Sequence, residues 1–525
     1  MTLTLSPLFS TGMVLQRDCP IPLTGTAPPR ELVSVSFLGE TRTAQADQNG
    51  RWSLTLGPYP YGGPYIMEIR SGGETRLLED ILIGELWLLG GQSNLQLPME
   101  RVRHMFPWET QQKQFPLLRL FRVPDRFSLA GPQAQITGGS WEAPSPESLP
   151  AFSAAGYFFG KALWAQLQIP IGLISAAIGG TPIQTWMGRD MLAPFPALLE
   201  ESRHWENRRD IDQIKAREAA RTAAYYADLD RRDRGLWENW AAPDFDDSSW
   251  DEAALDAPWD PPLQAPGVIW LRKTLRIPKH LAGQPAAVFL GTITDGDTLY
   301  VNGQAIGSTG YRYPPREYQI PALTPGTCTL ALRVLNLRGQ GEITPGKLRM
   351  LTAGSASFDL NSPWRLRRGC ESDPYQPESY FGGKPAAYFN GMIAPLCRYP
   401  IKGLLWYQGE SDCDAPAGYQ EKFSAMLRGW RSLWGTDFPV IFAQLPEYNR
   451  SYGADWERMR TEQVRCLQNK NTAMIYTRDV GEYNDLHPQN KQAIGQRFAQ
   501  AALILAYGKA FPPSPFLLFP EPEED

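Results

Sequence analysis

The chain has 525 residues, of which 42% are hydrophobic and 20% charged, which is enough for about two to four ordinary globular domains. Its formal net charge of −5 at pH 7 argues against a nucleic acid or an anionic membrane as partner, because both attract proteins with a basic face. The six cysteines form no CxxC pair, so we expect free thiols and neither a zinc cage nor a dense disulfide framework.

The first residues, MTLTLSPLFSTGMVLQRDCP, have neither the basic start nor the long apolar core of a signal peptide. No apolar run approaches the roughly 18 residues that a bilayer-spanning helix needs. We therefore expect a cytoplasmic protein with no membrane partner. A leader removed from the native chain would leave the same sequence and would make the protein secreted or periplasmic.

Residues 1–80 have the pattern of β-strands with one buried face. The segments VSVSFLG and YIMEIR alternate apolar and polar side chains with a period of two. The Asn49-Gly50 pair within QNGRWSLTL is a typical hairpin turn. The pattern predicts a small N-terminal β-sandwich domain over residues 1–80.

From residue 81 the pattern becomes that of an α/β protein. Residues 81–91, ILIGELWLLGG, are continuously apolar, as in a parallel strand that is buried on both faces. Residues 153–168 have helical spacing, and residues 169–187 contain a second buried strand that ends in two glycines. The mixed charges of residues 188–235 are typical of a solvated helical arm. We expect residues 81–235 to form the first part of an α/β domain.

A second β region interrupts this α/β domain. Residues 236–365 contain several alternating segments, among them DTLYVNGQAIG with an Asn302-Gly303 hairpin turn. The α/β pattern resumes in residues 366–515, which include the buried strand and polar loop IKGLLWYQGESD. The simplest organisation is a β domain inserted between the two parts of the α/β domain.

Polar residues gather where the predicted parallel strands end. In an open α/β sheet, ligands bind at the carboxyl ends of the strands. This rule selects four loops: 90–94, 179–181, 408–412 and 485–487. Together these loops contain a serine, a His–Asp pair and several amide donors, which are the groups that acyl transfer needs. Ser93 is the candidate nucleophile, although a serine here could instead cap the next helix, and the GxSxG motif of standard α/β-hydrolases is absent.

A general base must come from one of the four histidines: His104, His204, His280 and His487. His204 lies in the charged arm, His280 lies in the β insertion, and His104 has no nearby acid to orient it. His487 follows Asp485 at a spacing of two, so the carboxylate could hold Nδ1 while Nε2 takes the proton of the serine. A hydrogen-bonded capping pair would have the same spacing.

An acyl-transfer site also needs donors for the developing oxyanion. The candidates are the backbone N–H of Ser93, an N–H at Gly179-Gly180 and the side-chain amide of Gln408. Glu410 could instead be one of the two carboxylates of a glycosidase, but no second acid stands out. No HxH, HExxH or CxxC spacing is present, so we expect no metal and no other cofactor.

The four loops resemble those of a known family when taken in order. The segments are GGQSN, IGGTPIQTWM, GLLWYQGESD and NDLHPQNK, and they resemble the bacterial sialate O-acetylesterases within the SGNH or GDSL-like hydrolases. The segments LFSTGMVLQRDCPIPLTGTA and YFNGMIAPLCRYPIKG and the inserted β region are also similar to that family. The resemblance implies a flavodoxin-like α/β/α sandwich with a parallel sheet, an N-terminal β-sandwich domain and an inserted jelly-roll-like β domain.

The resemblance also implies the roles of the catalytic residues. Ser93 is the nucleophile and His487 the general base, and Asp485 is the acid that orients the histidine. SGNH hydrolases usually place this acid three residues before the histidine, so Asp479, or no acid at all, stays an alternative.

The resemblance further implies the donors of the oxyanion hole and the substrate. Gly180, with Gly179 as its alternative, matches the oxyanion glycine, and Gln408 matches a glutamine that related esterases use as a side-chain donor. The expected reaction is the removal of O-acetyl groups from sugars, with 9-O-acetylated sialic acid as substrate. Acetylxylan or another hemicellulose ester is the alternative, and a non-catalytic carbohydrate-binding protein is the alternative that is not an enzyme. The oligomeric state stays open.

Overall fold

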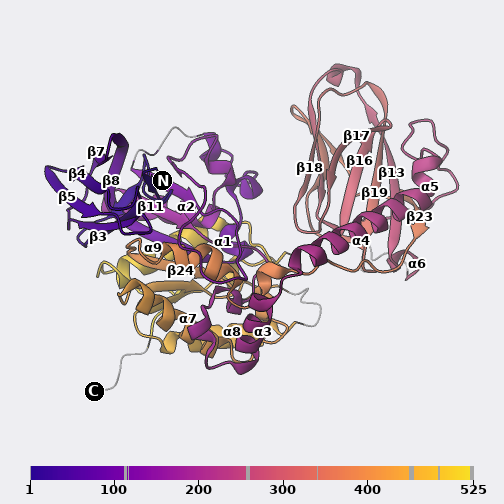
Figure 1. Ribbon diagram of the computed structural model, residues 1–525. Helices are drawn as coiled ribbons and strands as arrows, with labels where there is room; N and C mark the ends of the chain where they lie inside the picture. Colours follow the sequence, from indigo (N-terminus) through magenta and orange to yellow (C-terminus); the bar gives the residue numbers. More distant parts are fainter. Residues whose placement is uncertain are drawn as a thin grey trace. The chain divides into compact units, whose positions relative to one another are not determined.

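The computed structural model describes residues 2–111, 115, 117–255, 261–339, 341–448, 454–482 and 485–520. Contacts divide the chain into two compact units, which are coloured along the sequence in Figure 1. Unit 1 comprises Met1–Arg208 and Tyr380–Asp525, and unit 2 comprises Arg209–Ser379. None of the helices in the described part of the chain combines the length and the apolar character that crossing a membrane requires.

The centre of unit 1 is a parallel sheet, as the buried apolar runs predict. Its strands follow one another in the order β9, β11, β8, β24, β25, β26, and short antiparallel strands flank it on both sides. The bounds are β8 (Glu74–Gly91), β9 (Leu118–Arg122), β11 (Ile171–Ser175), β24 (Gly403–Tyr407), β25 (Val440–Ala443) and β26 (Thr472–Ile475), with β10 (Trp141–Glu142) and β27 (Leu517–Leu518) at the edges. Residues of β11, β24, β25 and β26 are all buried, because helices cover both faces of a parallel sheet.

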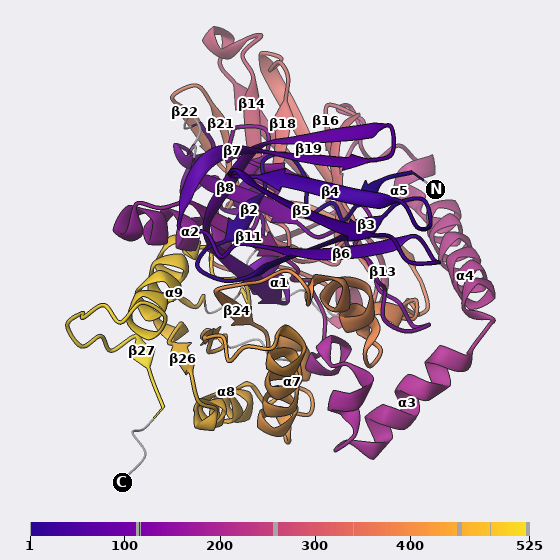
Figure 2. The same cartoon turned by 60° about the vertical axis from the view of Figure 1, so that its left-hand side comes forward.

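Two neighbouring residues of β24 show which helices cover which face. The ring of Trp406 lies 6.0 Å from that of Trp430 in α7 (Tyr419–Trp434). The ring of Tyr407 lies 6.5 Å from that of Phe498 in α9 (Lys491–Leu505). Successive side chains of a strand point to opposite faces, so α7 and α9 lie on opposite sides of the sheet, as Figures 1 and 2 also show. α2 (Ala154–Leu167) packs beside α9, and α8 (Trp456–Arg465) packs beside α7.

The N-terminal strands are joined to this sheet through β8, which has 18 residues. Its first half pairs with β7 and β2, and its second half pairs with β11 and β24. The other strands of this region form a hairpin and a small separate sheet. The bounds of all the strands before β8 are β1 (Thr4–Leu5), β2 (Val14–Gln16), β3 (Ile21–Thr26), β4 (Leu32–Phe37), β5 (Glu40–Gln45), β6 (Arg51–Leu56) and β7 (Gly62–Ser71). The limit predicted between residues 80 and 81 therefore falls inside one strand, and both sides of it share one hydrophobic core.

Unit 2 is wider than the predicted insertion, 236–365. The charged arm consists of two helices, α3 (Pro196–Asn207) in unit 1 and α4 (Ile211–Arg232) in unit 2. α4 belongs to unit 2 because Leu229 near its end is buried with Trp240 and Trp270. The pattern of mixed charges predicts the helices, but it does not show where one unit ends.

Unit 2 contains two antiparallel sheets around one core. The larger has the order β12, β23, β13, β19, β16, β17, and the smaller has the order β18, β14, β21, β22. The bounds are β12 (Asp251–Ala253), β13 (Gly267–Ile277), β14 (Ala286–Gly291), β16 (Gly296–Val301), β17 (Gln304–Thr309), β18 (Arg316–Ile320), β19 (Gly326–Asn336), β21 (Arg349–Ala353), β22 (Ala356–Asp359) and β23 (Trp364–Glu371), with β15 (Ile293–Thr294) and β20 (Glu342–Ile343) paired separately. Side chains from both sheets, such as Ile269 and Leu351, form the shared core.

Candidate active site

Ser93 lies where the longest central strand ends and a short helix begins. β8 ends at Gly91, which has a φ of +126°, and a Cβ there would lie 2.2 Å from the carbonyl oxygen of Tyr407. Only glycine fits this close approach, and it lets the chain turn directly into α1 (Ser93–Gln96). Ser93 is partly exposed between two buried neighbours, Gln92 and Asn94.

The alternative that Ser93 caps the next helix does not agree with this geometry. The residue that caps α1 is Gln92, and no side chain makes a capping hydrogen bond to that helix. Ser93 is instead the first residue inside the helix. Its hydroxyl therefore lies at the carboxyl edge of the sheet, where ligands bind in this class of fold.

His487 and Asp485 form a buried pair on the loop that precedes α9. The backbone N–H of His487 donates to Asp485 Oδ1 at 2.9 Å, and the Nδ1 atom of the imidazole lies 3.6 Å from the same oxygen. Burial lowers the pKa of His487 below its usual value, an effect that the carboxylate of Asp485 opposes. The imidazole is therefore neutral at pH 7, which is the protonation state that a general base needs.

Asp479, the alternative acid, has a different partner. Its carboxylate accepts two hydrogen bonds from the guanidinium of Arg497, at 2.7 and 2.5 Å. Of the two candidate acids, it is therefore Asp485 that lies beside His487.

One side chain ties the serine turn to the histidine loop. Asn94, which follows Ser93, donates from Nδ2 to the carbonyl oxygen of Leu486 at 2.9 Å, and Leu486 directly precedes His487. The neighbours of the candidate nucleophile and of the candidate base are thus in direct contact. Segments that are about 390 residues apart in the sequence therefore meet at one edge of the sheet.

The two glycines of the second loop are not equivalent. A Cβ on Gly179 would lie 3.3 Å from Ser93 Cβ, so this loop lies against the nucleophile turn. The N–H of Gly179 already donates to Gln96 Oε1 at 2.7 Å. Gly180 has a φ of +72° and open space around it, and within the described part of the chain neither its N–H nor that of Ser93 has an acceptor. Gly180 and Ser93 can therefore offer donors that Gly179 cannot.

Gln408 does not point its amide toward an open site. The side chain is fully buried, and Nε2 lies within hydrogen-bonding distance of Gln92 Oε1, Thr181 O and Asp412 Oδ2, at 3.1, 3.0 and 2.7 Å. Its Oε1 accepts a hydrogen bond from the hydroxyl of Tyr419. This geometry disfavours the predicted role of Gln408 in the oxyanion hole. Its contacts with the first two loops instead hold them beside the third.

Lys491 is a site residue that the sequence reasoning missed. It is fully buried at the start of α9, and its Nζ donates to Asn94 Oδ1 at 2.6 Å. Asn94 in turn donates to Glu410 Oε1 at 2.5 Å. Burial raises the pKa of Glu410 to about 7 and lowers the pKa of Lys491 to about 7. A lysine in the first turn of a helix opposes the helix dipole, and this could have drawn attention to it.

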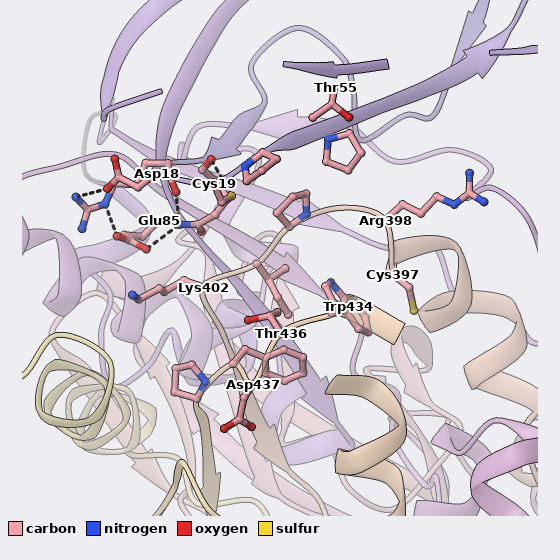
Figure 3. Close-up of a pocket in the computed structure, with 18 residues that line it drawn as sticks. Asp18, Cys19, Thr55, Glu85, Cys397, Arg398, Lys402, Trp434, Thr436 and Asp437 are labelled. Carbon is pink, nitrogen blue, oxygen red and sulfur yellow. Dashed lines mark hydrogen bonds and ion pairs between the residues drawn. The ribbon is translucent and has the colours of Figure 1, made fainter. Parts of the chain in front are cut away.

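Two further observations concern possible metal ligands and a cavity in unit 1. No group of three or more His, Cys, Asp or Glu side chains among the described residues is arranged to bind a metal ion. A cavity of about 620 Å³ lies in unit 1, lined among others by Glu85, Lys402 and Trp434, which Figure 3 labels. Glu85 pairs with the first residue of β11, and Lys402 directly precedes β24, so this cavity lies at the amino ends of the strands. It is therefore separate from the Ser93 turn.

Comparison with known proteins identifies the class to which this site belongs. Residues 83–216 and 388–504 match the family model described as "Carbohydrate esterase, sialic acid-specific acetylesterase". The match confirms the predicted resemblance, and it places the α/β part of the chain among the carbohydrate esterases. Within them, these two segments are similar to the sialic acid-specific acetylesterase family.

Curated relatives and a solved structure agree with this assignment. The sialate O-acetylesterase of Rattus norvegicus is 30% identical over 164 residues, 29% of this chain and 30% of that protein. The Homo sapiens protein of the same name is 28% identical over 223 residues, 37% of this chain and 43% of that protein. The chain thus spans less than half the length of these relatives. A carbohydrate acetylesterase of Xanthomonas citri has the same fold, with a TM-score of 0.59, 23% identity and coverage of 97% of this chain and 77% of that chain.

Proposed function

We propose that the protein is a serine esterase that removes O-acetyl groups from sugars through an acetyl-serine intermediate. Ser93 is the nucleophile, His487 the general base and Asp485 the residue that orients the imidazole. The observation that carries the proposal is the hydrogen bond from Asn94 to Leu486, because it joins the turn of a serine to the loop of a buried neutral histidine. The match to the esterase family supports the same reaction.

The reaction follows the order of steps that a serine and a histidine perform together. Ser93 Oγ attacks the acetyl carbonyl carbon, and His487 Nε2 takes the hydroxyl proton. The tetrahedral intermediate collapses when the bond from carbon to the sugar oxygen breaks, and His487 returns the proton to that oxygen. A water molecule then gives a proton to His487 Nε2 and attacks the carbonyl carbon of the acetyl-serine. The bond from that carbon to Ser93 Oγ breaks, His487 returns the proton to Oγ, and acetate leaves.

The oxyanion of both tetrahedral intermediates needs donors near Ser93. We propose the backbone N–H groups of Ser93 and Gly180, which have no acceptor among the described residues. One such donor typically stabilises the transition state by about 3–4 kcal/mol. Gln408 contributes indirectly in this scheme, because its amide holds the loops of Gln92 and Thr181 together.

The proposed substrate is an O-acetylated sugar, with 9-O-acetylated sialic acid as the first choice. The description of the matching family and the names of the curated relatives support sialic acid. An acetylxylan or hemicellulose ester is the second choice, because the same residues would cleave it.

The fold proposal goes with this function. The strand order β11, β8, β24, β25, β26 supports the proposed flavodoxin-like SGNH sandwich, and the two antiparallel sheets of unit 2 support the jelly-roll-like insertion.

The test measures acetate release by the full chain from p-nitrophenyl acetate, 9-O-acetylated sialic acid and acetylxylan. We expect Ser93→Ala to lower kcat by at least about 10³-fold on every ester that the wild type cleaves, because the acyl intermediate can no longer form. Ser432→Ala, which changes an exposed serine of α7, is the matched control and should leave kcat unchanged.

Labelling with a fluorophosphonate distinguishes the esterase from a non-catalytic carbohydrate-binding protein. The wild type should carry one label on Ser93, and the Ser93→Ala protein should carry none. Glycan binding without labelling and without acetate release would contradict the proposed function. Cleavage of acetylxylan but not of the sialate ester would retain the mechanism and change the substrate.

A further inference from the structure

Three polar side chains next to the turn that carries Ser93 are joined by hydrogen bonds. Lys491 Nζ donates to Asn94 Oδ1 at 2.6 Å, and Asn94 Nδ2 donates to Glu410 Oε1 at 2.5 Å. We call Lys491, Asn94 and Glu410 the lysine network. Its members come from the start of α9, from α1 and from the loop after β24. They thus belong to three of the segments that meet at the site.

Lys491 is in a place that is unfavourable for a cation. It has no exposed surface, and it is the first residue of α9, where the helix dipole is positive. Its positive charge is compensated by the oxygen of Asn94, by the ring face of Tyr407, 5.5 Å away, and by the carboxylate of Glu410. A buried charge with this compensation is often no more stabilising than an apolar side chain of the same size. Stability alone therefore does not explain why a lysine is there.

The lysine network fixes the orientation of one amide. Asn94 has one oxygen that accepts and one nitrogen that donates, and the two could exchange places by a rotation of the side chain. Below a pH of about 7, which is the pKa of Lys491, its side chain is an ammonium that can only donate, so it requires the oxygen of Asn94 on its side. Nδ2 is then directed to Glu410 Oε1 and to the carbonyl oxygen of Leu486. The bond to Leu486 is the one that joins the nucleophile turn to the loop of the base.

We propose that Lys491 is a positioning residue for the proposed ester hydrolysis: it fixes the amide of Asn94, which holds the turn of Ser93 against the loop of His487. The inference rests on the proposed function and adds to it a residue that does not touch the substrate. Misplacing reacting groups by about 1 Å can lower the rate by about 10²-fold. Holding the distance between the turn of Ser93 and the loop of His487 is therefore a sufficient reason for the buried lysine.

The charge of Lys491 has a second effect, on the base itself. The groups that act on the pKa of His487 are Asp485, which raises it, and Lys491 and Arg101, which lower it. Glu410, Asp485 and Glu482 in turn act on Lys491 and raise its pKa, while Arg101 lowers it. Loss of the lysine charge should therefore make His487 more basic. A side chain that only fills space would not change the pKa of the histidine in this direction.

The decisive variant is Lys491→Met, which keeps an unbranched side chain that is one atom shorter and removes the charge and the donor. We expect kcat for p-nitrophenyl acetate to fall by about 10-fold to 10²-fold with KM within about 3-fold, because placement and not binding is disturbed. Fluorophosphonate labelling of Ser93 should slow in parallel. The acid limb of the pH profile of kcat/KM should move to higher pH, because a cation near His487 is lost.

The matched control is Lys161→Met in α2. Lys161 is likewise a lysine of unit 1 that is paired with a buried carboxylate, that of Glu109 at 2.7 Å, but it is only partly buried and makes no hydrogen bond to the lysine network. This variant should lower the melting temperature without changing kcat or the acid limb. Lys491→Arg keeps the positive charge and should keep the acid limb near that of the wild type.

Each outcome decides between the inference and the proposed function. A folded Lys491→Met protein with the kcat and the acid limb of the wild type would overturn the inference and leave the proposed function intact. A wild type that neither cleaves esters nor is labelled would overturn both. If Lys491→Met does not fold, Lys491→Gln, which keeps an N–H donor without the charge, takes its place. An acid limb that does not move in that variant would overturn the inference.

Discussion

At the scale of single residues, the imidazole of His487 is held between opposing charges. Burial and the cations of Lys491 and Arg101 lower its pKa, and Asp485 raises it. The imidazole is therefore neutral at pH 7, and Asp485 opposes the lowering of its pKa, as the proposed role of general base requires. The sequence indicated His487 and Asp485 from their spacing and from the family resemblance.

Asp485→Asn should lower kcat by at least about 10²-fold, because the imidazole loses the carboxylate that orients it. The acid limb of kcat/KM should move to lower pH, since the removed anion raises the pKa of His487 in the wild type. This direction is opposite to that expected for Lys491→Met. The pH profile on p-nitrophenyl acetate provides the measurement.

Asp479→Asn is the control for this change, because Asp479 is paired with Arg497 and is more exposed. Its profile should match that of the wild type. A profile that changes with Asp479 and not with Asp485 would show that the orienting acid has been misassigned.

The lysine network could not be predicted at this scale. Lys491 and Asn94 are 397 residues apart, and no local pattern links them. The orientation of the Gln408 amide was equally hidden, because it depends on the acceptors that Gln92, Thr181 and Asp412 present in the folded protein. Sequence spacing indicates which loops meet, but it does not show how their side chains share hydrogen bonds.

At the scale of elements, the junction of β8 and α1 determines where Ser93, the proposed nucleophile, is placed. The apolar run and the glycine pair predicted the strand and its end, and both are found. The start of the strand was missed by several residues, because exposed Leu77 and buried Leu78 form part of the N-terminal hairpin with β7. A change from one buried face to two buried faces within one strand looks like a boundary between domains.

Gly91→Ala should disrupt this junction. The added Cβ would overlap the carbonyl oxygen of Tyr407, and the residue would have to keep a φ of +126°. We expect the free energy of unfolding to fall by roughly 3 kcal/mol or more, with loss of esterase activity, because β8 and β24 must separate at the site. Denaturant unfolding and p-nitrophenyl acetate hydrolysis test both effects.

Gly73→Ala serves as the matched glycine change in the turn between β7 and β8. A Cβ there meets nothing within 4 Å, so stability should change by less than about 1 kcal/mol. If both glycine variants behaved alike, the close approach of Gly91 to Tyr407 would not be a constraint on the fold.

At the scale of the whole molecule, the chain forms two units with separate cores. The core of unit 1 includes the N-terminal strands and the central sheet, whereas the clusters of unit 2 contain only its own residues. In unit 2, the fully buried Asp233 accepts hydrogen bonds from Trp270 Nε1 at 2.9 Å and from Arg333 Nε at 2.7 Å. The sequence predicted an inserted β region, but its limits depend on contacts of this kind.

Asp233→Ala should destabilise unit 2 by about 3–5 kcal/mol, because the guanidinium of Arg333 would lose its most buried partner. The melting transition of unit 2 should move to lower temperature. Hydrolysis of p-nitrophenyl acetate at room temperature should stay within about 2-fold of the wild type, since no proposed catalytic residue lies in this unit. Calorimetry measures the melting transitions, and the assay measures activity on the same samples. Loss of activity at the temperature of the first melting transition would contradict the view that the two units unfold separately.

The length of β8 also has a consequence for how molecules meet one another. The first half of the strand pairs with both β2 and β7, and the second half pairs with both β11 and β24. The backbone of the strand is thus hydrogen-bonded to neighbours on both sides across the junction between the two kinds of β-structure. Unpaired strand edges recruit strands from other molecules and lead to aggregation. Because β2 and β7 pair with the first half of β8, that half of the strand is not open to edge-to-edge association between molecules.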